Sequence, residues 1–92
     1  MVLAKARVES FEKFWQVFST IGAEHRAKHG SKGSQVYQDS GDPNTVWVMF
    51  NWDRSGYEGF IADPKTKEIF QKGGLQGPPE PIFLDHSGEA DA

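Results

Sequence analysis

The stretch from Asp42 to Asp53 constrains the fold more than any other part of the chain. It opens with a turn signal, Gly-Asp-Pro-Asn at 41–44, in which proline presets φ and the Asp and Asn side chains bond their own backbone. The aromatic and β-branched run that follows predicts a strand. Strand geometry then sends alternate side chains to opposite faces: Val46, Val48, Phe50 and Trp52 to one, and Thr45, Trp47, Met49 and Asn51 to the other. Both faces are largely apolar, so we expect this strand to be covered on both sides.

Length, composition and net charge limit the classes of protein to which this chain can belong. Ninety-two residues indicate a single domain with a small core. The absence of cysteine excludes disulfides, zinc–thiolate sites and a thiol nucleophile. A net charge of −3 argues against a nucleic-acid partner. The chain opens with a strand-like run rather than a signal segment, and its apolar runs are too short for a membrane span, so we expect a cytoplasmic protein with no membrane partner.

Hydrophobic periodicity predicts the other elements. Residues 2–9 alternate with Val2, Ala4, Ala6 and Val8 inward, as in a strand. Apolar residues at helical spacing predict one continuous helix over residues 11–28, ended by Gly30. The remaining predictions are a strand at 34–39, a hairpin loop at 40–44, helices at 55–62 and 64–72, and a last strand from 81 to 85 or 86. Residues 1–86 then form one domain, and residues 87–92 form a flexible tail.

The order of these elements is β-α-β-β-α-β, which makes this an α+β protein. Short connections and right-handed crossovers favour a four-stranded antiparallel sheet with both helical segments on one face. Three Trp and seven Phe in so short a chain make a bare opposite face improbable. Two such sheets packed face to face would cover it, so we expect a homodimer.

The chain also resembles a known family. The residues that carry the resemblance are Arg26-Ala-Lys-His-Gly30, Gly33-Ser-Gln-Val36, Asp42-Pro43-Asn44 with Val46, Asn51-Trp52-Asp53, Asp63-Pro64 and Gly77-Pro-Pro-Glu80. In these it is similar to the antibiotic biosynthesis monooxygenase-like branch of the dimeric α+β barrel (ferredoxin-like) superfamily. The resemblance implies a ligand pocket between sheet and helices in each protomer. Members include cofactor-independent quinol oxygenases, polyketide cyclases, haem-degrading enzymes and proteins of no known activity.

The residues argue against the haem-degrading members of that family. Their chemistry uses a histidine ligand on the second helical segment, about ten residues after a tryptophan. Phe60 stands where that tryptophan would lie, and no histidine occurs between His29 and His86. We therefore expect no cofactor.

His25 and His29 are the candidate catalytic residues. Both continue the apolar stripe of the 11–28 helix, and an imidazole can act as a general acid or base near neutral pH. The alternative is a structural role at a helix C-terminus, which favours positive charge. Their i, i+4 spacing also suits a metal, but a metal site needs a third ligand and Glu24 points elsewhere, so we predict none.

Five further residues are candidates for substrate binding: Trp52, Tyr37, Trp15, Asn51 and Phe60. For the aromatic residues among them, a place in the core is the alternative. Arg26 and Arg54 are predicted to be solvated or paired.

These residues and the resemblance suggest a cofactor-independent monooxygenase or a cyclase. Its ligand would be an aromatic, quinol or polyketide-like small molecule, with a base and a dry pocket supplied by the protein. The alternative is a non-catalytic binding or interaction module of the same fold.

Overall fold

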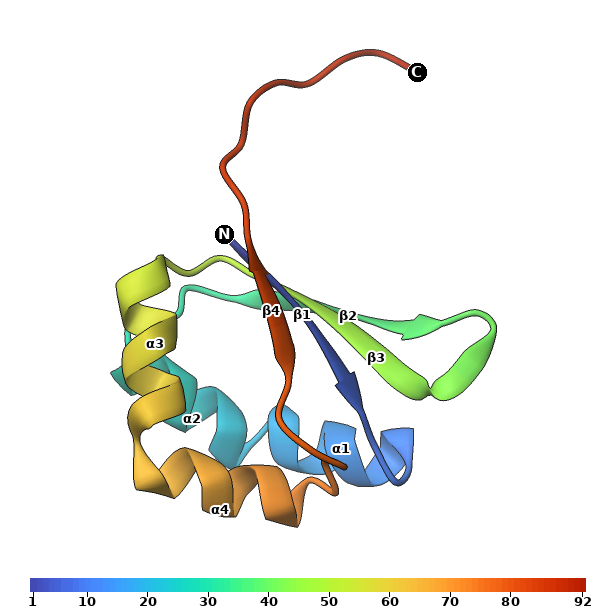
Figure 1. The fold of residues 1–92 in the computed structure, drawn as a ribbon, viewed down its shortest axis with the longest axis vertical. Coiled ribbons are helices and arrows are strands. Elements are labelled where there is room, and N and C mark those ends of the chain that lie inside the picture. Colours follow the sequence, from blue (N-terminus) through green and yellow to red (C-terminus); the bar gives the residue numbers. More distant parts are fainter.

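The computed structural model describes residues 1–92, which form a four-stranded sheet and four short helices (Figure 1). In chain order the elements are β1 (Val2–Arg7), α1 (Phe11–Phe18), α2 (Ile21–Lys28), β2 (Ser34–Asp39), β3 (Asp42–Phe50), α3 (Arg54–Ala62), α4 (Pro64–Lys72) and β4 (Glu80–Phe83). Residues 84–92 run out from the sheet without regular secondary structure (Figure 1).

The strands lie in the order β2-β3-β1-β4, and every neighbouring pair is antiparallel. Val2 lies opposite Phe50, and Ala6 lies opposite Val46, so the two central strands present their inward residues to the same side. The helices cover that side of the sheet (Figure 1). The ferredoxin-like α+β fold predicted from the sequence is confirmed.

The core lies between this sheet face and the helices. It contains the alternating residues that the sequence predicts to point inward: Val2, Ala4, Ala6 and Val8 near the N-terminus, and Val46, Val48, Phe50 and Trp52 from the central stretch. Phe14, Tyr57 and Phe60 close it from the helical side. Burial of these large apolar side chains is the main stabilising contribution to so small a domain.

The predicted single helix over residues 11–28 is wrong, because the chain breaks at Ser19 and Thr20. The Ser19 hydroxyl donates to the Trp15 carbonyl at 2.7 Å, and the Thr20 hydroxyl donates to the Gln16 carbonyl at 2.6 Å. Hydroxyls that bond back to the preceding turn compete with the backbone ladder, and Thr20 leaves helical geometry at φ −118° and ψ −100°. The break divides the predicted helix into two separate helices, α1 and α2.

The ends of the strands also differ from the predicted ones. β1 stops at Arg7, and Val8 instead forms an isolated bridge to Leu75. The predicted loop at 40–44 is shorter, because Asp42 already pairs with Asp39 after a register shift. The Asp39 carboxylate accepts the Gly41 N–H at 2.9 Å, which tightens the turn to two residues. The final strand ends at Phe83 rather than at 85 or 86.

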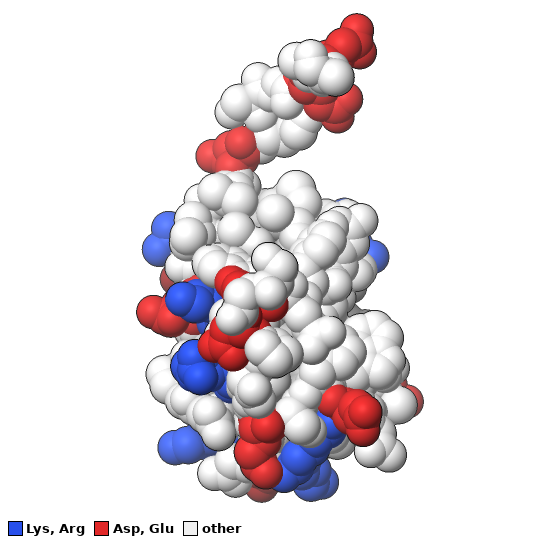
Figure 2. Space-filling model, turned by 90° about the vertical axis from the view of Figure 1, so that its right-hand side faces the viewer, with Lys and Arg blue, Asp and Glu red and all other residues white.

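The outer face of the sheet carries no helix. Residues from all four strands lie on it half-buried or exposed: Leu3, Lys5, Gln35, Tyr37, Trp47, Met49 and Ile82. On the side of the molecule drawn in Figure 2, acidic and basic side chains lie next to one another and form no broad basic patch. None of the four helices has the length and apolarity needed to cross a bilayer.

Candidate functional site

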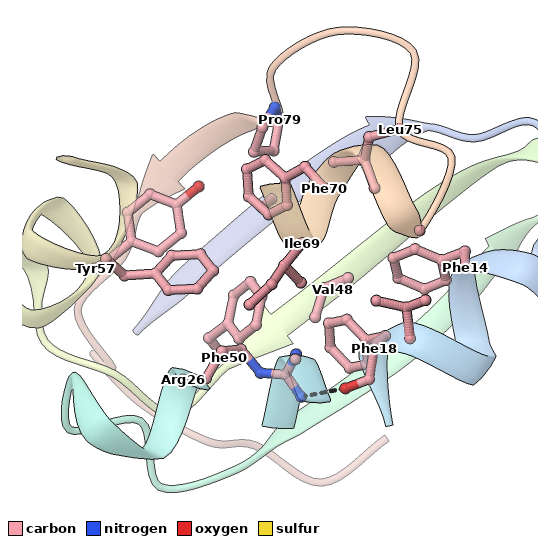
Figure 3. Close-up of a pocket in the computed structure, with 16 residues that line it drawn as sticks. Phe14, Phe18, Arg26, Val48, Phe50, Tyr57, Ile69, Phe70, Leu75 and Pro79 are labelled. Carbon is pink, nitrogen blue, oxygen red and sulfur yellow. Dashed lines mark hydrogen bonds between the residues drawn. The ribbon is translucent and has the colours of Figure 1, made fainter. Parts of the chain in front are cut away.

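A cavity lies between the sheet and the helices, and its walls are mostly aromatic. Twelve of its sixteen lining residues are hydrophobic, among them Phe14, Phe18, Phe50, Phe60 and Phe70 (Figure 3). The cavity has a volume of about 60 Å³, which is room for about four water molecules. A space of this kind excludes bulk water and therefore strengthens any charge interaction within it.

Small side chains on β1 create this space. Ala4 and Ala6 are the inward residues of a central strand, and both line the cavity floor. A larger side chain at either position would reach up into the helical layer. Gly73, at the C-terminal end of α4, lines the same space.

Arg26 is the only charged residue that lines the cavity. It comes from the last turn of α2 and is only 7% exposed. Its Nη2 donates to the Phe18 carbonyl at 3.0 Å, and its guanidinium lies 3.6 Å from the centre of the Phe18 ring (Figure 3). None of the ion pairs in the structure involves Arg26. Burial lowers the pKa of Arg26 to about 10, so the group stays charged at neutral pH.

Gly22 makes room for this guanidinium. A Cβ at position 22 would lie 3.0 Å from Arg26 Nη1 and 3.0 Å from the Val17 carbonyl oxygen. Such contacts are tighter than side chains usually make, so glycine here lets the arginine fold back over its own helix.

Tyr57 is the second polar side chain of the cavity. Its residue is 2% exposed, and its ring packs edge-on against Trp52 and Phe83. The hydroxyl makes no hydrogen bond to the protein, yet the structure contains no fully buried polar atom without a partner. The hydroxyl therefore keeps some exposure, and Tyr57 lines both the cavity and the groove outside it (Figure 3). Burial raises the pKa of Tyr57 to about 12, which keeps it a hydrogen-bond donor.

The cavity continues into an open groove between α3, α4, the 73–79 connection and β4. Four residues line both spaces: Tyr57, Phe70, Leu75 and Pro79. The groove has a volume of about 760 Å³. Arg26 lines the cavity but not the groove, and the groove alone has the volume of an ordinary ligand site.

The two candidate histidines lie on the other side of Phe60, outside the lining of the cavity. The Phe60 ring packs 5.4 Å from the His25 ring and 6.0 Å from the His29 ring. His29 Nε2 lies 3.0 Å from Asp63 Oδ2, and His25 Nε2 lies 3.4 Å from the same oxygen. His25 Nε2 also lies 2.7 Å from the hydroxyl of the fully buried Thr66. These four residues form the histidine cluster.

Hydrogen-bond directions in the histidine cluster follow from its acceptors. The Thr66 hydroxyl donates its single hydrogen to the Phe60 carbonyl, so it accepts from His25 Nε2. The Asp63 carboxylate accepts from His29 Nε2, and this bond is the largest cause that lowers the Asp63 pKa. Burial lowers the pKa of His25 below its ordinary value, and the nearby Asp63 charge offsets only part of that effect.

Of the five residues predicted to bind substrate, the structure places one, Phe60, on the cavity wall. Trp52 is buried behind it and donates its indole N–H to the His29 carbonyl at 2.9 Å. Tyr37 is 55% exposed on the outer sheet face, and Trp15 is 46% exposed on α1. Asn51 is exposed at the end of β3.

The prediction for Arg26 is wrong, whereas that for Arg54 is confirmed. Arg54 is exposed and pairs with Glu58 at 3.4 Å. Arg26 is neither solvated nor paired, because the break at Ser19 and Thr20 turns its side of α2 inward. Arg26 follows Gly22 by four residues and Phe18 by eight, which places it next to the apolar stripe of the predicted helix. This spacing could have indicated that Arg26 is buried. Tyr57 is buried, and no pattern in the sequence indicates its free hydroxyl.

No model of a protein family matches the chain, and no curated protein matches it. Solved structures do. An antibiotic biosynthesis monooxygenase matches with a TM-score of 0.59 and 15% identity, over 95% of this chain and 97% of its own. The chain shares the fold of antibiotic biosynthesis monooxygenases.

Two further structures extend that comparison. A monooxygenase from the gene ActVA-Orf6 of Streptomyces coelicolor, solved with the ligand nanaomycin D, matches with a TM-score of 0.67 and 19% identity over 99% of this chain and 89% of its own. An uncharacterized NIPSNAP domain protein from Burkholderia xenovorans matches with a TM-score of 0.66 and 19% identity, over 99% and 97%. The resemblance stated from the sequence is confirmed as a likeness of fold.

Proposed function

We propose that this protein binds an aromatic, quinol or polyketide-like molecule in the cavity and acts on it as a cofactor-independent monooxygenase or a cyclase. The ligand places an anionic oxygen, a phenolate or an enolate, against Arg26. Its oxygen-bearing end enters the small cavity, and its rings occupy the larger groove beside Tyr57 and Pro79.

The observation that carries this proposal is the unpaired charge of Arg26. Removing a cation from water without a counter-ion costs several kcal/mol, and proteins normally compensate such a group with a carboxylate. Arg26 has one backbone carbonyl and one aromatic face instead. An anionic ligand would supply the missing partner, in a dry site where the attraction is strong.

The same charge supports a reaction. A guanidinium beside a phenol or an enolisable ketone favours the anion, so Arg26 promotes loss of the substrate's proton. An electron-rich anion of this kind can reduce O₂ directly; one oxygen atom then becomes a carbonyl of the product, and the other leaves as water. The protonated Tyr57 donates a hydrogen bond to a second substrate oxygen.

The histidines have no part in this mechanism, because Phe60 separates them from the cavity. The cavity consequently offers no side-chain base, and the proton leaves through the groove to water. That same feature favours the second candidate function, a non-catalytic binding module, since Arg26 and Tyr57 can hold a ligand without turning it over.

Oxygen consumption with a hydroxylated anthrone separates the monooxygenase from the binding module, and conversion of a polyketide mimic without oxygen uptake would identify the cyclase. We expect the wild-type chain to accelerate oxygen uptake, and Arg26→Met to lower kcat/KM by about a hundredfold, the scale of one lost oxyanion contact. Arg54→Met removes an exposed, paired arginine and should leave the rate unchanged. Tight binding with no oxygen uptake above the uncatalysed rate would favour the binding module.

We also propose that the protein is a homodimer, joined through the outer sheet face. Trp47, Met49 and Ile82 lie on this face, which no helix covers, and apolar faces of this kind usually mark interfaces. Light scattering should give about twice the chain mass of 10.3 kDa. Trp47→Glu should shift the mass to that of one chain, and a wild-type monomer at micromolar concentration would contradict the proposal.

A further inference from the structure

The histidine cluster brings together three side chains that commonly bind metals. His25 and His29 lie one turn apart on α2, and Asp63 comes from the start of α4. One ligand atom from each lies within 4.8 Å of the other two. The sequence predicts no metal site because only two ligands are visible in it, and the fold supplies the third from 34 residues away.

Two of the three separations between these ligand atoms are close to those of a tetrahedral site. Metal–nitrogen and metal–oxygen bonds of 2.0–2.2 Å at a tetrahedral angle place neighbouring ligand atoms about 3.4 Å apart. The observed separations from Asp63 Oδ2 are 3.4 Å to His25 Nε2 and 3.0 Å to His29 Nε2. The two rings meet nearly at right angles, with centres 5.1 Å apart, so their edges converge without stacking. The two imidazole nitrogens lie within 4.8 Å of each other, and side-chain rotation that brings them closer would complete the geometry.

The Asp63 carboxylate is held in place for this role by its own helix. Oδ1 caps α4 by accepting the Lys65 N–H at 2.9 Å, and Pro64 fixes the backbone that follows. Oδ2 is thereby left facing the histidines. Ligands that are oriented by a second hydrogen bond in this way are typical of built metal sites.

Burial is uneven across the cluster, which leaves one side open. His25 is 5% exposed and lies against Thr66, whereas the side chains of His29 and Asp63 remain 24% and 30% exposed. An ion can enter from the His29 side and keep a water in a fourth position, as three-ligand zinc sites do.

We propose that His25 Nε2, His29 Nε2 and Asp63 Oδ2 bind one borderline divalent metal ion, of which Zn²⁺ is the first to test. Two imidazoles and one carboxylate form a donor set that suits Zn²⁺ and its neighbours better than Mg²⁺ or Ca²⁺. Both imidazoles carry their proton on Nε2 when no ion is bound, so coordination moves each proton to Nδ1. No proton is released from a neutral ring. None of these three ligands lines the cavity or the groove.

The test uses the full chain without a histidine tag, treated with EDTA and titrated with ZnCl₂ by calorimetry. We expect one ion per chain with a micromolar Kd. Asp63→Asn keeps a good helix cap but removes the charge, and His29→Gln removes a ligand, so each should weaken binding at least about tenfold. His86→Gln, in the exposed tail, and Asp53→Asn, the equivalent cap of α3, are matched controls that should bind as the wild type does.

Cobalt at a saturating concentration gives a second readout, which reports the coordination number of the bound ion. Four-coordinate Co²⁺ absorbs visible light strongly, whereas hydrated six-coordinate Co²⁺ absorbs weakly. We expect the strong spectrum in the wild type and its loss in Asp63→Asn. Three results would each overturn the proposal. The wild type could fail to bind the metal, only His86→Gln could abolish binding, or Asp63→Asn could bind as tightly as the wild type.

Discussion

The cavity around Arg26 and the histidine cluster share one wall, Phe60, but they differ in whether their buried polar groups have hydrogen-bond or ion-pair partners. In the histidine cluster each known donor has an acceptor: His25 with Thr66, and His29 with Asp63. In the cavity a full positive charge has no carboxylate, and the Tyr57 hydroxyl has no protein partner. The cluster completes its own hydrogen bonds, and the cavity leaves two groups available to a ligand.

This contrast predicts different effects on stability when each polar group is removed. A partnered group leaves its partners unsatisfied when it is lost, whereas the loss of Arg26 removes an uncompensated buried charge and frees only the Phe18 carbonyl at the end of α1. Substitutions in the two regions should therefore change the free energy of unfolding in opposite directions.

Asp63→Ala should have the largest effect on stability. It removes the cap of α4 and the acceptor of His29, and we expect it to lower the free energy of unfolding by about 2 kcal/mol. Urea unfolding in EDTA measures this without metal. Asp53→Ala is the matched control, because it removes a similar cap from α3 but touches no histidine. Equal losses in the two variants would show that the histidine contact contributes nothing.

Arg26→Met should raise the free energy of unfolding by about 1 kcal/mol, since a flexible apolar side chain replaces an unpaired buried cation. The same urea experiment measures it. A loss of 2 kcal/mol or more would mean that the guanidinium's contacts with Phe18 stabilise the fold, and the contrast between the two regions would then fail.

Gly22→Ala should leave stability nearly unchanged while it weakens ligand binding. Alanine favours a helix by about 1 kcal/mol over glycine, which offsets the crowding of Arg26 Nη1 and the Val17 carbonyl. The displaced guanidinium should then lower ligand affinity several-fold, as measured by calorimetry. Gly59→Ala, on the cluster side of α3, meets only His29 Nδ1 at 3.6 Å and should bind ligand as the wild type does.

The smallest expected effect is a change in pH dependence on the cluster side. The pKa of His25 in the folded protein lies below its ordinary 6.5, so on acidification the unfolded chain takes up the proton first. This contribution to stability is therefore complete above 6.5 and is lost as the pH falls. His25→Gln keeps a donor for Thr66 but cannot titrate, so unfolding curves at about pH 7 and about pH 5 should differ less than in the wild type. An unchanged difference would contradict this assignment.

The fold was predictable because its signals are local and repeated. Alternation in residues 2–8 and 46–52 identifies the inward faces of the two central strands, and Asp63-Pro64 marks the start of α4. The break after Phe18 was not predictable, because it depends on where the Ser19 and Thr20 hydroxyls turn.

The site was harder to predict than the fold, for two physical reasons. A buried unpaired charge such as Arg26 goes against the general tendency of its residue type, so residue type alone argues for a solvated side chain. Asp63 meets His25 and His29 only through the packing of α4 on α2, which no spacing in the sequence reveals. Phe60 could be identified from the sequence as a pocket residue, because an aromatic side chain suits both a core and a cavity wall.

The central claim is that Arg26 is a ligand-binding charge, and one comparison of affinities tests it most directly. Lawsone, a hydroxynaphthoquinone that is ionised at neutral pH, and its uncharged methyl ether have nearly the same shape. Calorimetry should show that the wild type binds lawsone at least about tenfold more tightly than the ether, and that Arg26→Met removes this preference. Equal affinity of the wild type for both compounds, or a preference that survives in Arg26→Met, would contradict the claim.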